Sequence, residues 1–251
     1  NDKQVIANTF NSFFTEIGLQ ISANLPNPIH RPEFFFDKAN FQTNVNFQFY
    51  EVDVHDILKI VDSFSSRKAT GPDRIPMRSI KESKLIILPI LVYLTNLVVK
   101  TSIFPDCLKI ARVKPLFKKG DKNVCTNYRP ISVLPALAKI IEKTLSFQIR
   151  EYLETNSLLT DCQFGFRTNR STSDAINFIM EQLYDNFNTR KITQGIFLDF
   201  SKAFDTINHN ILIQKLVYYG FSESSKNLIQ NYLKNRKQFV SLDGIESQFN
   251  T

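Results

Sequence analysis

Apolar residues recur every three or four positions along most of this chain, a spacing that predicts amphipathic helices. The predicted helices lie at about residues 5–23, 53–64, 84–100, 135–153, 210–219 and 222–235, and a further one begins after residue 170. Ser171 and Asp174 have the spacing of a capping box, which supports the start of that last helix. The pattern therefore predicts a chain rich in helix.

Short runs of branched and aromatic residues predict strands between these helices. ARVKPLF (111–117) predicts a strand, and the basic turn after it predicts a return strand. ITQGIFLDF (192–200) is the best candidate for a buried strand, and the Asp-Gly pair in QFVSLDGIESQF (238–249) predicts a hairpin. This order of elements favours an α+β fold, in which helices back a sheet.

Two segments rich in Pro, Asn or Gly predict irregular connections. Residues 26–49 are expected to form a connector, with extended pieces such as NVNFQFY (44–50). Residues 65–81 are expected to form a loop that leads into the apolar helix at 84–100.

The composition favours a folded intracellular protein. A hydrophobic content of 43% in 251 residues is enough for the core of one large domain or two small ones. The three cysteines are scattered, which predicts neither a disulfide framework nor a zinc site. No segment resembles a signal peptide, and the apolar run at 86–99 is interrupted by Pro89 and too short to span a membrane.

Positive charge is concentrated in the middle of the chain. Residues 100–150 carry eleven Lys and Arg against three acidic residues, a balance of +8 compared with +7 for the whole chain. Such a concentration favours a polyanionic partner, because cations that neutralise phosphates release counterions. A solvated basic face is the alternative interpretation.

Asp199 ends the predicted strand at 192–200, where a carboxylate would suit divalent-metal binding and phosphoryl transfer. The alternative is that Asp199 caps the turn or helix that follows. The spacing of Asp199 and Asp205 alone does not separate these interpretations.

Several motifs together resemble the reverse transcriptases of non-LTR (LINE-type) retrotransposons, in their jockey-like branch. The segment FLDFSKAFDTINHNILIQKLVYYG (197–220) is similar to the first catalytic motif of that family. Its companions occur in the family's order: IANTFNSFFTEIG (6–18), KATGPDRIP (68–76), KPLFKKGD (114–121), NYRPISVLP (127–135) and QFGFRTNRST (163–172).

The resemblance implies a right-hand polymerase fold, with fingers, the start of the palm and a truncated C-terminus. The implied parts are a preceding segment at 1–50, a helical extension of the fingers at 51–110, fingers at 111–191 and a partial palm at 192–251. The reverse transcriptase domain would occupy about residues 100–251.

The resemblance also implies roles for residues of the first motif. Asp199 would be catalytic and bind Mg²⁺ (or Mn²⁺), with the backbone carbonyl of Phe200 as a further ligand. Phe204 would exclude a ribose 2′-OH from the nucleotide pocket; without the motif, ordinary core packing would be its default interpretation. Asp205 is expected to be structural, and His209 is expected to begin the next helix.

Further residues are implied to bind nucleotide or nucleic acid. Arg112, Lys118 and Arg129 correspond by spacing to residues that hold the incoming nucleoside triphosphate. In QFGFR, the residues Gly165, Phe166 and Arg167 would touch the template strand, the alternative being a structural turn before the helix at 171.

The implied activity is that of an RNA-directed DNA polymerase, which extends a DNA primer on an RNA template from dNTPs. These partners imply a protein of the cytoplasm and nucleus that binds no membrane. The family's YADD-type pair of aspartates occurs nowhere in the 251 residues, so we expect this fragment to be inactive. The alternative function is that of a relic that acts only as an RNA-binding or interaction protein.

Overall fold

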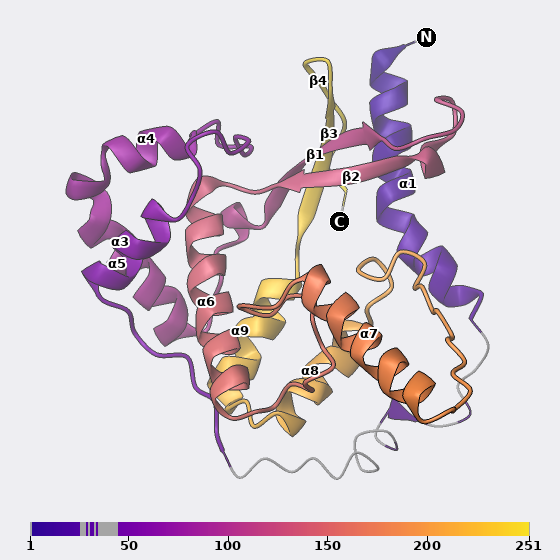
Figure 1. The fold of residues 1–251 in the computed structure, drawn as a ribbon. Helices are drawn as coiled ribbons and strands as arrows, with labels where there is room; N and C mark the ends of the chain where they lie inside the picture. The colour runs from indigo at the N-terminus through magenta and orange to yellow at the C-terminus, as the bar shows by residue number, and fades with distance from the viewer. Residues whose placement is uncertain (1, 26–28, 30, 33, 35–44, 251) are drawn as a thin grey trace.

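A computed structural model describes residues 2–25, 29, 31–32, 34 and 45–250. Its helices are α1 (Lys3–Ala23), α3 (Val54–Asp62), α4 (Met77–Glu82), α5 (Lys84–Thr101), α6 (Ala136–Thr155), α7 (Thr172–Asn188), α8 (His209–Tyr218) and α9 (Glu223–Leu233). Its strands are β1 (Ile110–Phe117), β2 (Tyr128–Val133), β3 (Lys237–Leu242) and β4 (Ile245–Glu246). Figure 1 shows the strands in the upper part of the view, with α1 crossing them, α3, α4 and α5 to the left, and α7, α8 and α9 below.

The four strands form one sheet in the order β2-β1-β3-β4. β1 and β2 pair antiparallel, as the basic turn between them predicts, and β1 and β3 pair parallel. β3 and β4 form the hairpin predicted from the Asp-Gly pair, and both turn residues have positive φ, 49° at Asp243 and 85° at Gly244. Two consecutive positive φ angles are what a tight two-residue hairpin turn requires.

Polar caps start several helices where the sequence predicts them. Asp53 and Asp56 form a capping box at α3, and Ser171 and Asp174 form another at α7. The side chain of Asn208 accepts from the first backbone N–H groups of α8, so His209 begins that helix as expected. These caps satisfy N–H groups that have no partner inside the helix.

Three hydrophobic clusters hold the elements together. One joins α1 to the sheet through buried side chains, which are Ala7, Phe10, Phe14, Val113 and Val240. A second lies among α3, α5 and α6 and includes Ile57, Val61, Leu88, Leu91 and Ile140. The third packs α6 and α9 around the chain at 47–49 and includes Phe47, Phe221, Leu228, Ile141 and Leu145. α6 contributes to two of these clusters, so it is the central helix.

Among the described helices, α5 is the one whose length and composition would allow it to cross a membrane. The core helix of a globular domain meets the same criteria. Leu88, Leu91 and Val98 of α5 are buried in the helical clusters, which is the arrangement of a core helix.

The prediction of a buried strand at 192–200 is wrong. These residues form extended chain that pairs with no described strand, and they are exposed, with Ile192 at 100% and Phe197 at 94% of their full accessible surface. A strand is held by hydrogen bonds to a neighbouring strand. Apolar, branched residues favour that conformation but carry no information about the partner.

The loop prediction for 65–81 is wrong at its end, where α4 begins at Met77. Pro76 directly precedes α4, and there its fixed φ and missing N–H cost nothing.

The predicted connector at 26–49 lies mostly outside the described residues. Within NVNFQFY, Phe47 forms an isolated parallel bridge with Phe221, and Phe47 and Phe49 are buried.

The KATGPDRIP loop lies against the junction between β2 and α6. A Cβ added at Gly71 would lie 2.6 Å from the carbonyl oxygen of Leu134 and 2.7 Å from the nitrogen of Pro135. Both atoms belong to the backbone, so neither can move aside as the end of a flexible side chain could. Glycine at this position therefore allows the loop to pack closely.

We expect Gly71→Ala to lower the free energy of unfolding by about 1–3 kcal/mol, because the added methyl group overpacks the junction. Urea denaturation followed by circular dichroism measures this change. Gly165→Ala is the matched control, since a Cβ there meets no atom within 4 Å, and it should change the stability by less than about 0.5 kcal/mol. Equal destabilisation by both substitutions would contradict the packing argument.

Candidate nucleic-acid interface

The β1–β2 hairpin presents a row of cations on one face. Side chains of a strand alternate between the two faces, and directly opposed residues share a face. Lys114 lies opposite Ile131 and Leu116 opposite Arg129, so Arg112, Lys114 and Arg129 project to the same side. Val113, on the other side of β1, is buried against α1. The cations therefore lie on the face of the sheet that α1 leaves open.

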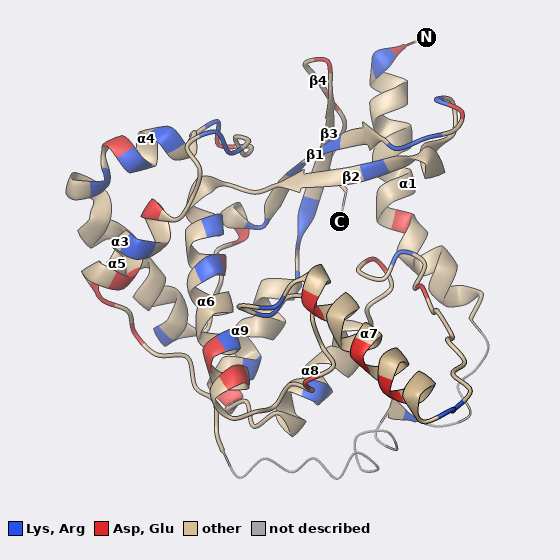
Figure 2. Ribbon diagram, viewed as in Figure 1, with Lys and Arg blue, Asp and Glu red and all other residues tan. Residues whose placement is uncertain are grey.

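The hairpin cations lack acidic partners within the described part of the chain. None of the ion pairs there includes a basic residue of 110–133, where Asp121 is the only acidic residue. Figure 2 shows Lys and Arg along this hairpin, whereas α7 carries acidic residues and no basic ones. The result is an exposed positive surface, which attracts polyanions.

The tip of the hairpin is ordered by hydrogen bonds to the backbone. The N–H of Lys118 donates to the carbonyl of Asn127 at 2.8 Å, which extends the ladder one step beyond the strands. The side-chain amide of Asn127 donates to the carbonyl of Asp121 at 2.9 Å, and Gly120 takes a positive φ of 93°. Lys118 and Lys119 are thus exposed on a braced turn.

Arg112 has a structural partner in addition to its place in the row. Its guanidinium donates to the carbonyl of Thr70 in the KATGPDRIP loop, and the ammonium of Lys139 donates to the neighbouring carbonyl of Ala69 at 2.8 Å. Burial lowers the pKa of Lys139; Asp73 opposes the shift, and repulsion from Lys68 and Arg112 adds to it. The loop is thus held by cations through neutral carbonyl groups, which leaves the positive charge of the region uncompensated.

Asp199 lies in the exposed extended segment, not in a cluster of ligands. No group of three or more His, Cys, Asp or Glu side chains in the described residues could hold a metal ion. Phe200 and Asp205 are also exposed. A pair of divalent ions needs several oxygen ligands. Within the described residues, Asp199 and the carbonyl of Phe200 therefore do not by themselves complete the Mg²⁺ or Mn²⁺ site that the resemblance implies.

The turn after Asp199 contacts α1. The backbone carbonyl of Asp205 touches the position that a Cβ on Gly18 would occupy, so a side chain there would displace the turn. The contact is made by the backbone of Asp205, whose side chain is exposed.

An ion pair ties the QFGFR loop to the end of α6. The guanidinium of Arg167 donates to both carboxylate oxygens of Glu154, at 3.0 and 2.6 Å, and to the carbonyl of Thr160 at 2.8 Å. This pairing lowers the pKa of Glu154 and raises that of Arg167. Arg167 therefore holds its loop to α6, whereas Gly165 is exposed and has no atom near its Cβ position.

Phe166 and Phe204 come together although 38 residues separate them in the sequence. Their rings lie edge to face with centroids 6.1 Å apart, and both side chains remain largely exposed. Phe166 also takes a positive φ of 62°, which is uncommon for a bulky residue. The structure thus joins the predicted template loop to the predicted nucleotide-selecting residue.

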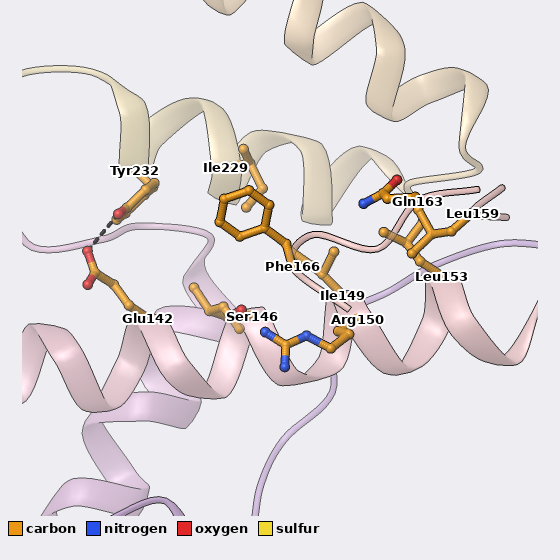
Figure 3. Close-up of a pocket in the computed structure, with 11 residues that line it drawn as sticks. Glu142, Ser146, Ile149, Arg150, Leu153, Leu159, Gln163, Phe166, Ile229 and Tyr232 are labelled. Carbon is orange, nitrogen blue, oxygen red and sulfur yellow. Dashed lines mark hydrogen bonds between the residues drawn. The ribbon is translucent and has the colours of Figure 1, made fainter. Parts of the chain in front are cut away.

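A cavity of about 500 Å³ opens beside this loop, between α6 and α9 (Figure 3). Glu142 of α6 accepts a hydrogen bond of 2.6 Å from the hydroxyl of Tyr232 on α9. Burial raises the pKa of Glu142, while the Tyr232 hydrogen bond opposes the shift. Burial also raises the pKa of Tyr232, and the carboxylate of Glu142 adds to that shift. The sequence pattern did not predict this pair. The one feature that could have indicated it is that Glu142 is one of only three acidic residues in the basic stretch at 100–150.

Comparisons with known proteins agree with these motifs. A family model described as reverse transcriptase (RNA-dependent DNA polymerase) matches residues 117–250. The chain is 26% identical over 194 residues to the probable RNA-directed DNA polymerase from transposon BS of Drosophila melanogaster. The aligned region covers 74% of this chain and 21% of that protein. It is also 26% identical over 197 residues to the RNA-directed DNA polymerase from mobile element jockey of the same species, which covers 78% of this chain and 21% of the relative.

A third relative is the probable RNA-directed DNA polymerase from transposon X-element of Drosophila melanogaster, 25% identical over 183 residues, which cover 72% of this chain and 20% of that protein. The chain spans about a fifth of the length of these relatives. The family model itself covers more than half of the chain. On that match, the chain belongs to the reverse transcriptase (RNA-dependent DNA polymerase) family.

Proposed function

We propose that this chain is the nucleic-acid-binding and nucleotide-binding part of the RNA-directed DNA polymerase of a non-LTR mobile element. The observation that carries the proposal is the row of cations on the open face of the β1–β2 hairpin, which has no acidic partner among the described residues. The full reaction would transfer nucleotides from dNTPs to a DNA primer on an RNA template. Such partners place the working protein in the cytoplasm and nucleus.

The chemistry of the hairpin suits phosphate binding. Lys118 and Arg129 are exposed and have no acidic partner in the described residues. Arginine binds phosphate oxygens through two parallel N–H groups, whereas lysine acts as a point charge. Arg112 would contribute from the base of the row while it holds the KATGPDRIP loop. These three residues are our proposed nucleotide-binding set.

The family membership supports finer assignments, which remain part of this proposal. The fold would be a right hand, with fingers at 111–191 and the start of the palm at 192–251. Asp199 would be the catalytic acid, Phe200 would lend its carbonyl, and Phe204 would select the sugar. The contact between Phe166 and Phe204 supports a template path that passes close to the selecting residue.

A second candidate function is RNA binding without polymerisation. It is favoured by one observation, which is that Asp199 lies in an exposed segment and belongs to no group of three or more metal-binding side chains in the described residues. Both candidates share the hairpin as the RNA-binding surface. They differ in whether chemistry at Asp199 takes place.

We expect the chain to bind single-stranded RNA with a strong dependence on salt. Removing two phosphate contacts with Lys118→Ala/Arg129→Ala should reduce the slope of log K against log [salt] by about 1.4, since each contact on a single strand contributes about 0.7. Fluorescence anisotropy of a labelled RNA across a salt series measures both slopes.

Lys100→Ala/Lys234→Ala is the matched control for this experiment. It removes the same charge from exposed positions outside the hairpin that have no ion pair in the described residues. Its slope should stay close to that of the unaltered chain. Equal loss in both double variants would assign binding to net charge and refute a role for the hairpin.

We expect the isolated 251-residue chain not to extend a DNA primer on an RNA template, because a single carboxylate leaves the catalytic ions without enough ligands. A gel assay with dNTPs and Mg²⁺ measures extension, and anisotropy on the same primer–template verifies that the chain binds it. Extension that Asp199→Ala abolishes would contradict this prediction and would remove the second candidate function.

A further inference from the structure

The cavity between α6, α9 and the loop at 159–166 has the size and lining of a binding site. Its volume of about 500 Å³ lies within the range of pockets that hold small organic ligands. Its walls are largely apolar and are formed by Leu145, Ile149, Leu153, Leu159 and Ile229. A flat organic ring would find favourable contacts there, with polar groups only at defined points.

The first polar point is the carboxylate of Glu142. Its Oε1 accepts from the Tyr232 hydroxyl at 2.6 Å. No other hydrogen bond to this carboxylate is found in the described residues, and no buried side-chain oxygen or nitrogen there lacks a partner. The second oxygen, Oε2, is therefore accessible from the cavity. An ionised carboxylate only accepts hydrogen bonds, so the ligand must present N–H or O–H donors to it.

Arg150 is a second polar point, farther along α6 in the wall of the cavity. It lies eight residues after Glu142 on α6, which corresponds to about 12 Å along the helix at 1.5 Å per residue. It is exposed and forms no ion pair within the described residues. A guanidinium with its donors free is suited to a phosphate group.

Phe166 supplies an aromatic surface between these two points. Figure 3 shows its ring between Ile229 of α9 and the surface of α6. The side chain is 85% exposed, so most of the ring is open to a ligand. Stacking of a base on an aromatic side chain is a common means of binding unpaired nucleotides.

We propose that this cavity binds one guanine nucleotide, with the base edge at Glu142, the ring against Phe166 and the phosphate at Arg150. Guanine carries two adjacent donors, N1–H and the N2 amino group, which match Oε2 and the remaining lone pair of Oε1, beside the Tyr232 hydroxyl. Adenine and cytosine each offer only an amino group as a donor on this edge. The N–H of uracil lies between two carbonyl oxygens, and the carboxylate oxygens of Glu142 would repel both. If the nucleotide is part of an RNA strand, the inference rests on the proposed function. If the nucleotide is free in solution, the inference is independent of the proposed function.

The test compares three short RNAs: an oligouridine, the same strand with one central guanosine, and the same strand with one central adenosine. Fluorescence anisotropy on the full chain should give about tenfold tighter binding of the guanosine strand than of the oligouridine, with the adenosine strand in between. GMP titrated against the guanosine complex separates the two sources of the nucleotide. Competition by GMP shows that the free nucleotide also enters, and its failure restricts the site to the strand.

Two variants address the cavity itself. Glu142→Gln keeps the shape and the Tyr232 contact but replaces an acceptor by an N–H₂ donor, so the guanosine preference should fall to the oligouridine level. Ser146→Trp fills the cavity from an exposed position of α6 and should have the same effect. Ser12→Trp, at an exposed position of α1, is the matched control and should keep the preference.

Equal affinity of the unaltered chain for all three RNAs, together with no binding of GMP, would overturn the inference. A guanosine preference that survives Glu142→Gln would overturn it as well. Neither result affects the proposed function, provided that oligouridine binds in a salt-dependent way. Conversely, loss of all RNA binding would refute the proposed function, while GMP binding that needs Glu142 would still support the cavity.

Discussion

The backbone hydrogen bonds between β1 and β3 join two parts of the chain that lie far apart in sequence, with Ile110 paired to Lys237 and Val113 to Val240. The side chains of Val113 and Val240 on one face of these strands are apolar, so that face has to be covered from water. α1 provides the cover, since Phe10 and Phe14 pack on Val113 and Val240. The N-terminal helix, the middle of the chain and its last hairpin therefore fold as one unit.

This cover also decides where the positive charge can act. Because α1 occupies one face of β1, the alternation of side chains directs Arg112, Lys114 and Arg129 to the other face. Arg112 and Lys139 hold the KATGPDRIP loop through carbonyl groups, and Gly71 allows that loop to approach the start of α6. The hairpin thus presents its cations from a braced base, which suits contact with a rigid polyanion.

The segment that carries Asp199 has a different character. Its apolar residues are exposed, and no described strand pairs with it. Exposed, unpaired apolar chain is a liability for aggregation. At its end, the turn at Asp205 rests on Gly18 of α1, and Phe204 meets Phe166. The ends of this segment are therefore anchored, while the stretch that holds the predicted catalytic acid has no partner of its own.

Local chemistry determined what the sequence alone could predict: the helices other than α4, the cap at Ser171, the β1–β2 turn and the Asp-Gly hairpin all depend on residues a few positions apart. The family motifs are likewise continuous stretches of sequence. Only the tertiary structure decided the β1–β3 pairing, the ion pair of Arg167 with Glu154, and the meeting of Glu142 with Tyr232. It also left 192–200 without the strand partner that its composition favours. The physical reason is the same in each case: whether a strand pairs, or a charge is compensated, depends on what lies opposite it in space, and periodicity along the chain does not contain that information.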